Sequence, residues 1–98
     1  MKVKILVVCA NPNILRVILR LINANEDWQG LGTSTFEEAK APLASEKFDL
    51  LLIGSGLTQA EEQGLIEYAQ SKVPNTRIIQ HYGGGSGLLS AEIYQALA

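Results

Sequence analysis

The stretch Val3-Lys-Ile-Leu-Val-Val-Cys-Ala-Asn-Pro-Asn13 decides the fold. Its first part, Val3–Val8, is apolar and rich in β-branched residues, which is typical of a strand covered on both faces. Asn11 can then cap a helix, and Pro12 suits the first helical turn. Apolar residues follow at helical spacing and predict one buried stripe: Ile14, Val17, Ile18, Leu21 and Ile22. The segment therefore predicts a buried strand that leads directly into an amphipathic helix.

The same alternation continues to the end of the chain. Further strands are expected at Trp28–Thr33, at residues 48–53 and at residues 77–82. Two helices begin with capping boxes, one formed by Thr35 and Glu38 and the other by Thr58 and Glu61. Pro42 lies inside the first of these helices, which we therefore expect to be short or irregular. The last helix places Leu89, Ile93 and Leu97 on the core.

Strands that alternate with helices of this length predict an α/β fold with a parallel sheet and right-handed crossovers. We expect a single domain over residues 1–98, built as a three-layer sandwich. Its four-stranded sheet should have the order 2-1-3-4. Functional loops are expected beyond the carboxyl ends of the strands.

Composition excludes several functional classes. Charged residues make up only 18% of the chain, and the net charge is −2. The basic residues are scattered, so we expect neither nucleic-acid binding nor attachment to a membrane surface. The single cysteine cannot form an internal disulfide, which favours a reducing compartment. Residues 5–10 are too short an apolar run for a signal-peptide core or a membrane span, so we expect a cytoplasmic protein.

Several segments resemble the receiver domains of response regulators, whose fold is flavodoxin-like. The similarity lies in an apolar pattern with a few turn residues and covers most of the chain. The segments that carry it are Lys4-Ile-Leu-Val-Val-Cys-Ala-Asn-Pro-Asn13, Gly32-Thr-Ser-Thr-Phe-Glu-Glu-Ala39, Phe48-Asp-Leu-Leu-Leu-Ile-Gly-Ser-Gly-Leu57 and Pro74-Asn-Thr-Arg-Ile-Ile79.

The resemblance implies a receiver that has lost its phosphorylation chemistry. The acidic pair that holds Mg²⁺ in the family falls at Cys9 and Ala10, and the aspartate that accepts the phosphoryl group falls at Gly54. The family's hydroxyl position falls at Tyr82, or at His81 with a shift of one residue. Its lysine has no counterpart, because the chain skips a helix and a strand there. We therefore expect a pseudo-receiver without catalysis, metal or cofactor.

Three other interpretations stay open at this point. Cys9 lies where sugar-phosphotransferase B domains carry a phosphocysteine, although the loop after it lacks glycine, and a buried, unreactive thiol is the simpler interpretation. The glycine-rich loop before the last helix is a candidate for binding an anion or nucleotide, or simply makes a tight turn: Gly83, Gly84, Gly85, Ser86 and Gly87. Ser55, Gly56 and His81 are a weak candidate for an oxyanion-type pocket, because no acid orients the histidine.

The strand at residues 77–82 should be an edge strand, since no fifth strand follows it. Unpaired strand edges and apolar patches mark association sites. We expect the partner to be another protein or a second copy of the chain, with a homodimer favoured. The candidate interface residues are Ile79, His81, Tyr82, Leu88 and Tyr94.

Overall fold

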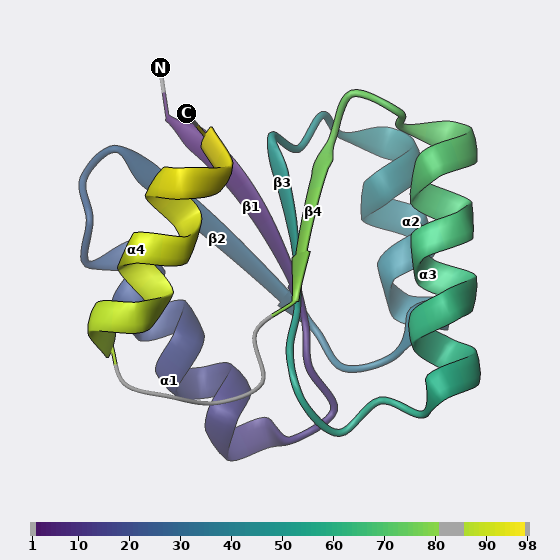
Figure 1. Cartoon of the computed structure of the whole chain (residues 1–98), viewed down its shortest axis with the longest axis horizontal. Coiled ribbons are helices and arrows are strands. Elements are labelled where there is room, and N and C mark those ends of the chain that lie inside the picture. Colours follow the sequence, from purple (N-terminus) through teal and green to yellow (C-terminus); the bar gives the residue numbers. More distant parts are fainter. Residues whose placement is uncertain (1, 81–85, 98) are drawn as a thin grey trace.

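A computed structural model describes residues 2–80 and 86–97, and strands and helices alternate along them as the sequence predicts (Figure 1). The elements are β1 (Val3–Val8), α1 (Pro12–Asn23), β2 (Trp28–Thr33), α2 (Phe36–Ser45), β3 (Leu50–Ile53), α3 (Gln59–Lys72), β4 (Arg77–Gln80) and α4 (Ser86–Leu97). Over these described residues, no helix combines the length and the apolar character needed to cross a membrane.

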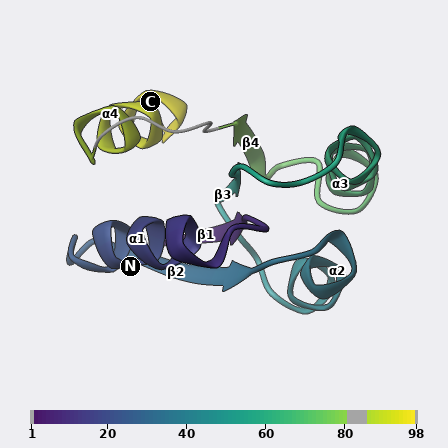
Figure 2. The same ribbon diagram turned by 90° about the horizontal axis from the view of Figure 1, so that it is seen from below.

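The four strands form one parallel sheet with the order β2-β1-β3-β4, which confirms the predicted topology. Figure 2 shows the three layers from below, with α1 and α4 on one face of the sheet and α2 and α3 on the other. The two edge strands of the sheet are therefore β2 and β4.

The core consists of two apolar clusters, one on each face of the sheet. In β1, Ile5 and Val7 belong to the cluster under α1 and α4, whereas Leu6 and Val8 belong to the cluster under α2 and α3. Every residue of β3 is fully buried. Each such aliphatic side chain contributes about 1.5–3 kcal/mol when it is removed from water, so the two central strands account for much of the stability.

Two of the predicted helix caps are present in full, whereas in the third Thr35 accepts from Glu38 N–H but the Glu38 carboxylate accepts from Ser34 and completes no box with Thr35. Asn11 Oδ1 accepts hydrogen bonds from the backbone N–H groups of Asn13 and Ile14. Thr58 and Glu61 form a complete capping box, in which each side chain accepts from the other residue's backbone N–H. These contacts satisfy N–H groups that the first helical turn leaves without partners.

The helices depart from the sequence predictions at three points. Val17, expected in the buried stripe, is 43% exposed, because the fully covered face of α1 is narrower and centred on Ile18 and Ile22. Helix α2 is short, at ten residues, as expected, but it runs through Pro42 without interruption, since a proline this close to the end of a helix removes only one of the last hydrogen bonds. Helix α4 begins at Ser86, so Ser86 and Gly87 lie in the helix and not in the predicted loop.

The strands differ from the predictions only at their ends. Strand β3 begins at Leu50 rather than at residue 48, although Asp49 N–H already donates to the carbonyl of Lys4. Among the described residues, strand β4 ends at Gln80. The expected continuation through His81 and Tyr82, and the glycines 83–85, lie outside the described residues.

Candidate functional site

The carboxyl edge of the sheet is closed by backbone hydrogen bonds between the ends of three strands. Cys9 N–H donates to Thr33 O at 3.0 Å, and Gly54 N–H donates to Val8 O at 2.8 Å. One residue further on, Ala10 N–H donates to Ser55 O at 3.1 Å. The predicted positions Cys9, Ala10 and Gly54 are therefore adjacent in space.

The Cys9 thiol lies at the centre of this edge and is fully buried. Its Sγ lies 3.4 Å from Ser55 O and 3.5 Å from Asn11 O, so the thiol donates toward two backbone carbonyls. The predicted burial of Cys9 is confirmed. A thiol that is buried against backbone carbonyls is not accessible to reagents in the folded protein.

Gly54 and Cys9 fit together because residue 54 has no side chain. A Cβ atom built on Gly54 would lie 2.8 Å from Cys9 Cβ and 3.0 Å from Cys9 Sγ. Separations this short require the neighbouring atoms to move, and here the closest atom is fixed to the strand backbone. Any larger residue at position 54 would therefore displace Cys9.

Two residues at this edge of the sheet carry buried hydroxyl groups. Thr33 Oγ1 and Ser55 Oγ have no hydrogen-bond partner among the described residues. Asn11, a polar residue two positions after Cys9, already accepts hydrogen bonds from two N–H groups of α1. The suggested partner of Ser55, His81, lies outside the described residues, so the serine–histidine pair stays a prediction.

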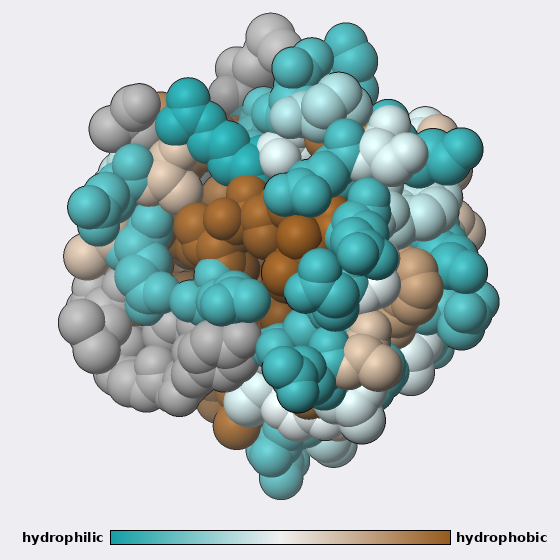
Figure 3. All heavy atoms as spheres, turned by 45° about the vertical axis from the view of Figure 1, so that its right-hand side comes forward, coloured by the Kyte–Doolittle hydropathy of each residue, from teal (hydrophilic) through white to brown (hydrophobic). Residues whose placement is uncertain are grey.

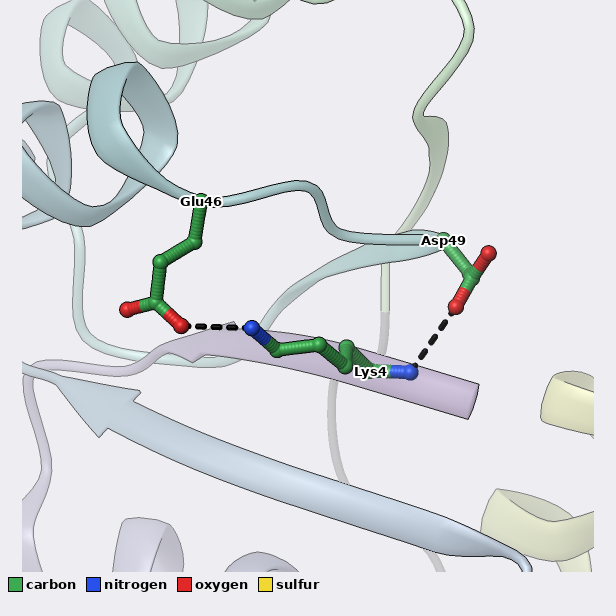
Figure 4. A network of polar contacts seen from close by, with 3 residues as sticks. All are labelled: Lys4, Glu46 and Asp49. Carbon is green, nitrogen blue, oxygen red and sulfur yellow. Dashed lines mark hydrogen bonds and ion pairs between the residues drawn. The ribbon is translucent and has the colours of Figure 1, made fainter. Parts of the chain in front are cut away.

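Two acidic side chains, Glu46 and Asp49, lie at the opposite edge of the sheet. Asp49 stands just before β3, at the edge of the sheet opposite Gly54, where its Oδ2 accepts from Lys4 N–H at 2.9 Å. The Lys4 ammonium pairs with Glu46, as Figure 4 shows. Within residues 2–80 and 86–97, no three histidine, cysteine or acidic side chains come together in a group that could hold a metal ion.

A cleft of about 480 Å³ opens at this amino-terminal edge, between the segments that lead into β3 and β4. Lys47, Lys72 and Arg77 contribute positive charge to its walls, and Asp49 contributes a negative charge. The Arg77 guanidinium donates to the carbonyl of Ala96 near the end of α4. Arg77 thus has a structural role in joining α4 to β4.

The β4 edge carries the interface residues that the structure describes. Ile79 is half-buried and lines a groove between β4 and α4 together with Gln80, Glu92, Gln95 and Ala96. We call this groove of about 410 Å³ the β4 trough. Leu88 lies in the first turn of α4, whereas His81, Tyr82 and the loop glycines 83–85 are not among the described residues.

Tyr94 does not join the other interface candidates. Although its side chain is 58% exposed, its ring packs against Trp28 with the centroids 5.0 Å apart, and its hydroxyl accepts from Asn25 Nδ2. These contacts place Tyr94 on the side of α4 that faces α1 and β2. The role of Tyr94 in an interface therefore stays a prediction.

No protein-family model and no curated protein matches the chain. Several solved structures, however, are similar to the chain. A CheY-like response regulator receiver domain protein from Methanospirillum hungatei is 26% identical, with a TM-score of 0.75 over 100% of this chain and 78% of that one. The signal receiver domain of an HD domain-containing protein from Pseudomonas fluorescens is 22% identical, with a TM-score of 0.75 over 99% and 77% of the two chains. The receiver domain of the hybrid histidine kinase CckA is 17% identical, with a TM-score of 0.79 over 97% and 99%. The chain is thus a receiver-like domain, and this fold suggests a signalling module.

Proposed function

We propose that this receiver-like domain is a non-catalytic pseudo-receiver that works by binding a protein and takes no phosphoryl group on an aspartate. The observation that carries the proposal is the close fit of Gly54 against Cys9 at the carboxyl edge of the sheet. The resemblance assigns the phosphoacceptor aspartate to position 54. A carboxylate there would displace Cys9, which is itself fully buried.

The remaining features support a protein as the partner. The net charge of −2 does not favour attraction to nucleic-acid phosphates. One edge of the sheet, by contrast, is apolar and half-buried at Ile78 and Ile79. We infer that this edge binds another protein or a second copy of the chain. A cytoplasmic location is part of the proposal and is supported by the single free cysteine.

A phosphodonor assay tests the proposal. The protein is incubated with acetyl phosphate and Mg²⁺, and its intact mass is then measured. We expect no gain in mass and no change in the amide spectrum on addition of beryllofluoride. A stable gain of one phosphoryl group on a carboxylate, or a beryllofluoride-dependent spectral change, would contradict it.

The same assay addresses the phosphocarrier alternative. A phosphoryl group on Cys9 would require an accessible thiolate, whereas the Cys9 thiol is fully buried and directed toward carbonyl oxygens. We therefore expect slow modification of native Cys9 by a thiol reagent at neutral pH, and fast modification after unfolding. Rapid labelling of the native protein, together with a phosphoryl group that Cys9→Ala removes, would establish the phosphocarrier instead.

A further inference from the structure

The backbone of β4 has hydrogen-bonding groups on both sides, and only one side has a partner strand. Arg77 N–H donates to Asp49 O at 3.1 Å, so the amide groups of Arg77 face β3. Residues alternate along a strand, so Ile79 also faces β3, whereas the N–H and C=O groups of Ile78 and Gln80 point the other way. Among the described residues, no strand pairs with that side.

The side chains beside this open backbone are apolar on both faces of the sheet. Ile78 packs partly against the cluster under α2 and α3, and Ile79 packs partly against the cluster under α1 and α4. Figure 3 shows the result as an apolar hollow over β4, between α3 and α4, with a hydrophilic rim. The β4 trough with its volume of about 410 Å³ lies on the α4 side of this hollow.

We propose that the open side of β4 binds one extended segment of another protein, which adds to the sheet as a fifth strand. This inference rests on the proposed binding role and identifies the chemistry of the partner. Outward N–H and C=O groups two residues apart are the pattern that an added strand recognises. Because Ile78 and Ile79 lie on opposite faces, both sets of alternating side chains in the added strand meet apolar surface.

The polar side chains of the β4 trough specify the partner further. Among the described residues that line it, Glu92 carries the charge, and Gln80 and Gln95 supply amide groups. A segment with apolar residues in its centre and polar residues at its ends therefore complements the site.

The geometry favours a single strand over a second copy of the domain. In Figure 2 the strands lie one above another and β4 is the uppermost of them. Helix α4 lies at the same height as β4, so the helix is beside the open edge of the sheet. Two copies that joined their β4 strands through a two-fold axis perpendicular to the sheet would carry their α4 helices on the same face. Both helices would then compete for the space above the junction, whereas a lone strand needs only the width of about 4.8 Å beside β4.

The test uses the acetylated and amidated peptide KVIVTVK as the probe. We expect saturable binding that slows amide hydrogen exchange at Ile78 and Gln80 by about tenfold or more. Exchange at Arg77 and Ile79 should change little, because their N–H groups already face β3. The same peptide with N-methyl groups on its central amides keeps the side chains, loses the backbone donors and should not bind.

Two variants of an exposed residue give the matched control. Gln80→Pro removes one outward donor and should weaken peptide binding by about tenfold, which corresponds to one hydrogen bond. Gln80→Ala loses the same side chain but keeps the backbone donor, so it is the reference for Gln80→Pro and should bind about tenfold more tightly than Gln80→Pro. The exchange pattern of the wild-type protein decides the question even if Gln80→Pro folds poorly.

Several outcomes would overturn this inference. They are no binding at millimolar peptide, equal binding of the N-methylated peptide, or slowed exchange that excludes Ile78 and Gln80. Concentration-dependent dimerisation that protects these two amides without peptide would identify a second copy as the occupant. If the peptide fails while the phosphodonor assay shows no phosphoryl transfer, the inference fails and the proposed function stands.

Discussion

The two edges of this sheet are treated differently by the rest of the molecule. At the β2 edge, two of the outward N–H groups have partners: Trp28 N–H donates to Asn25 O at 3.1 Å, and Gly30 N–H donates to Asn23 Oδ1 at 2.9 Å. At the β4 edge, the outward groups of Ile78 and Gln80 meet no partner strand among the described residues. Because an unpaired edge invites pairing unless it is blocked, the comparison identifies β4 as the edge available for binding.

Helix α1 is what closes the β2 edge. It packs so closely on β2 that a Cβ atom on Gly30 would lie 3.0 Å from Ile22 Cγ2, and one on Gly32 would lie 2.6 Å from Leu19 Cδ1. The last turn of the same helix and the turn after it supply Asn23 and Asn25. A helix that lies directly on an edge strand thus brings side chains within reach of the strand's outward amides.

The largest expected effect tests whether the backbone N–H groups along β4 point alternately toward β3 and away from it. Ile79→Pro removes an N–H that faces β3 and truncates a half-buried side chain, so the free energy of unfolding should fall by about 3 kcal/mol or more. Gln80→Pro removes an outward N–H and should lower it by about 1 kcal/mol or less. Urea unfolding of the two variants measures the difference. Equal losses would mean that Ile79 and Gln80 do not face opposite sides of β4.

A smaller effect is expected at the β2 edge. Asn23→Ala leaves Gly30 N–H without its side-chain acceptor and should lower the free energy of unfolding by about 1–2 kcal/mol. Asn23→Asp keeps the acceptor oxygen and is the matched control. Amide exchange at Gly30 should accelerate in Asn23→Ala only. Unchanged exchange in that variant would show that Asn23 does not protect the edge.

The sequence predicted the order of elements because the patterns were local. Strand β1 is apolar at consecutive positions, and the Thr58–Glu61 box marks a helix start within four residues. The sequence also predicted that β4 is an edge strand, because it is the last of the four expected strands. The closure of the β2 edge was not predicted, because the contact between Asn23 and Gly30 joins two residues with no characteristic motif.

Other parts of the candidate site depend on how elements are rotated and spaced. The apolar period of the last helix placed Leu89 and Ile93 on the core, but it did not show that Tyr94 would turn toward Trp28. The resemblance paired Cys9 with Gly54 as two lost functional positions. Their steric fit depends on the distance between β1 and β3, which only the three-dimensional structure supplies.

The smallest expected effect concerns the carboxyl end of β2. Glu38 accepts hydrogen bonds from the Ser34 hydroxyl at 2.7 Å and from Ser34 N–H at 3.0 Å, and these bonds lower the pKa of Glu38 below its ordinary value of 4.5. A carboxyl group whose pKa is lower in the folded state stabilises the fold above the unfolded-state pKa, and this contribution disappears as the pH falls through the folded-state value. Glu38→Gln should therefore lower the urea midpoint slightly at pH 7, and the difference from the wild type should shrink below about pH 4. Glu26→Gln, at an exposed site between α1 and β2, serves as the control for the loss of one negative charge. If the urea midpoint of Glu38→Gln stayed below that of the wild type by the same amount down to pH 2, the charge of Glu38 would not stabilise the contact between β2 and α2. Helix α1 would then be the helix that stabilises the β2 side of the sheet.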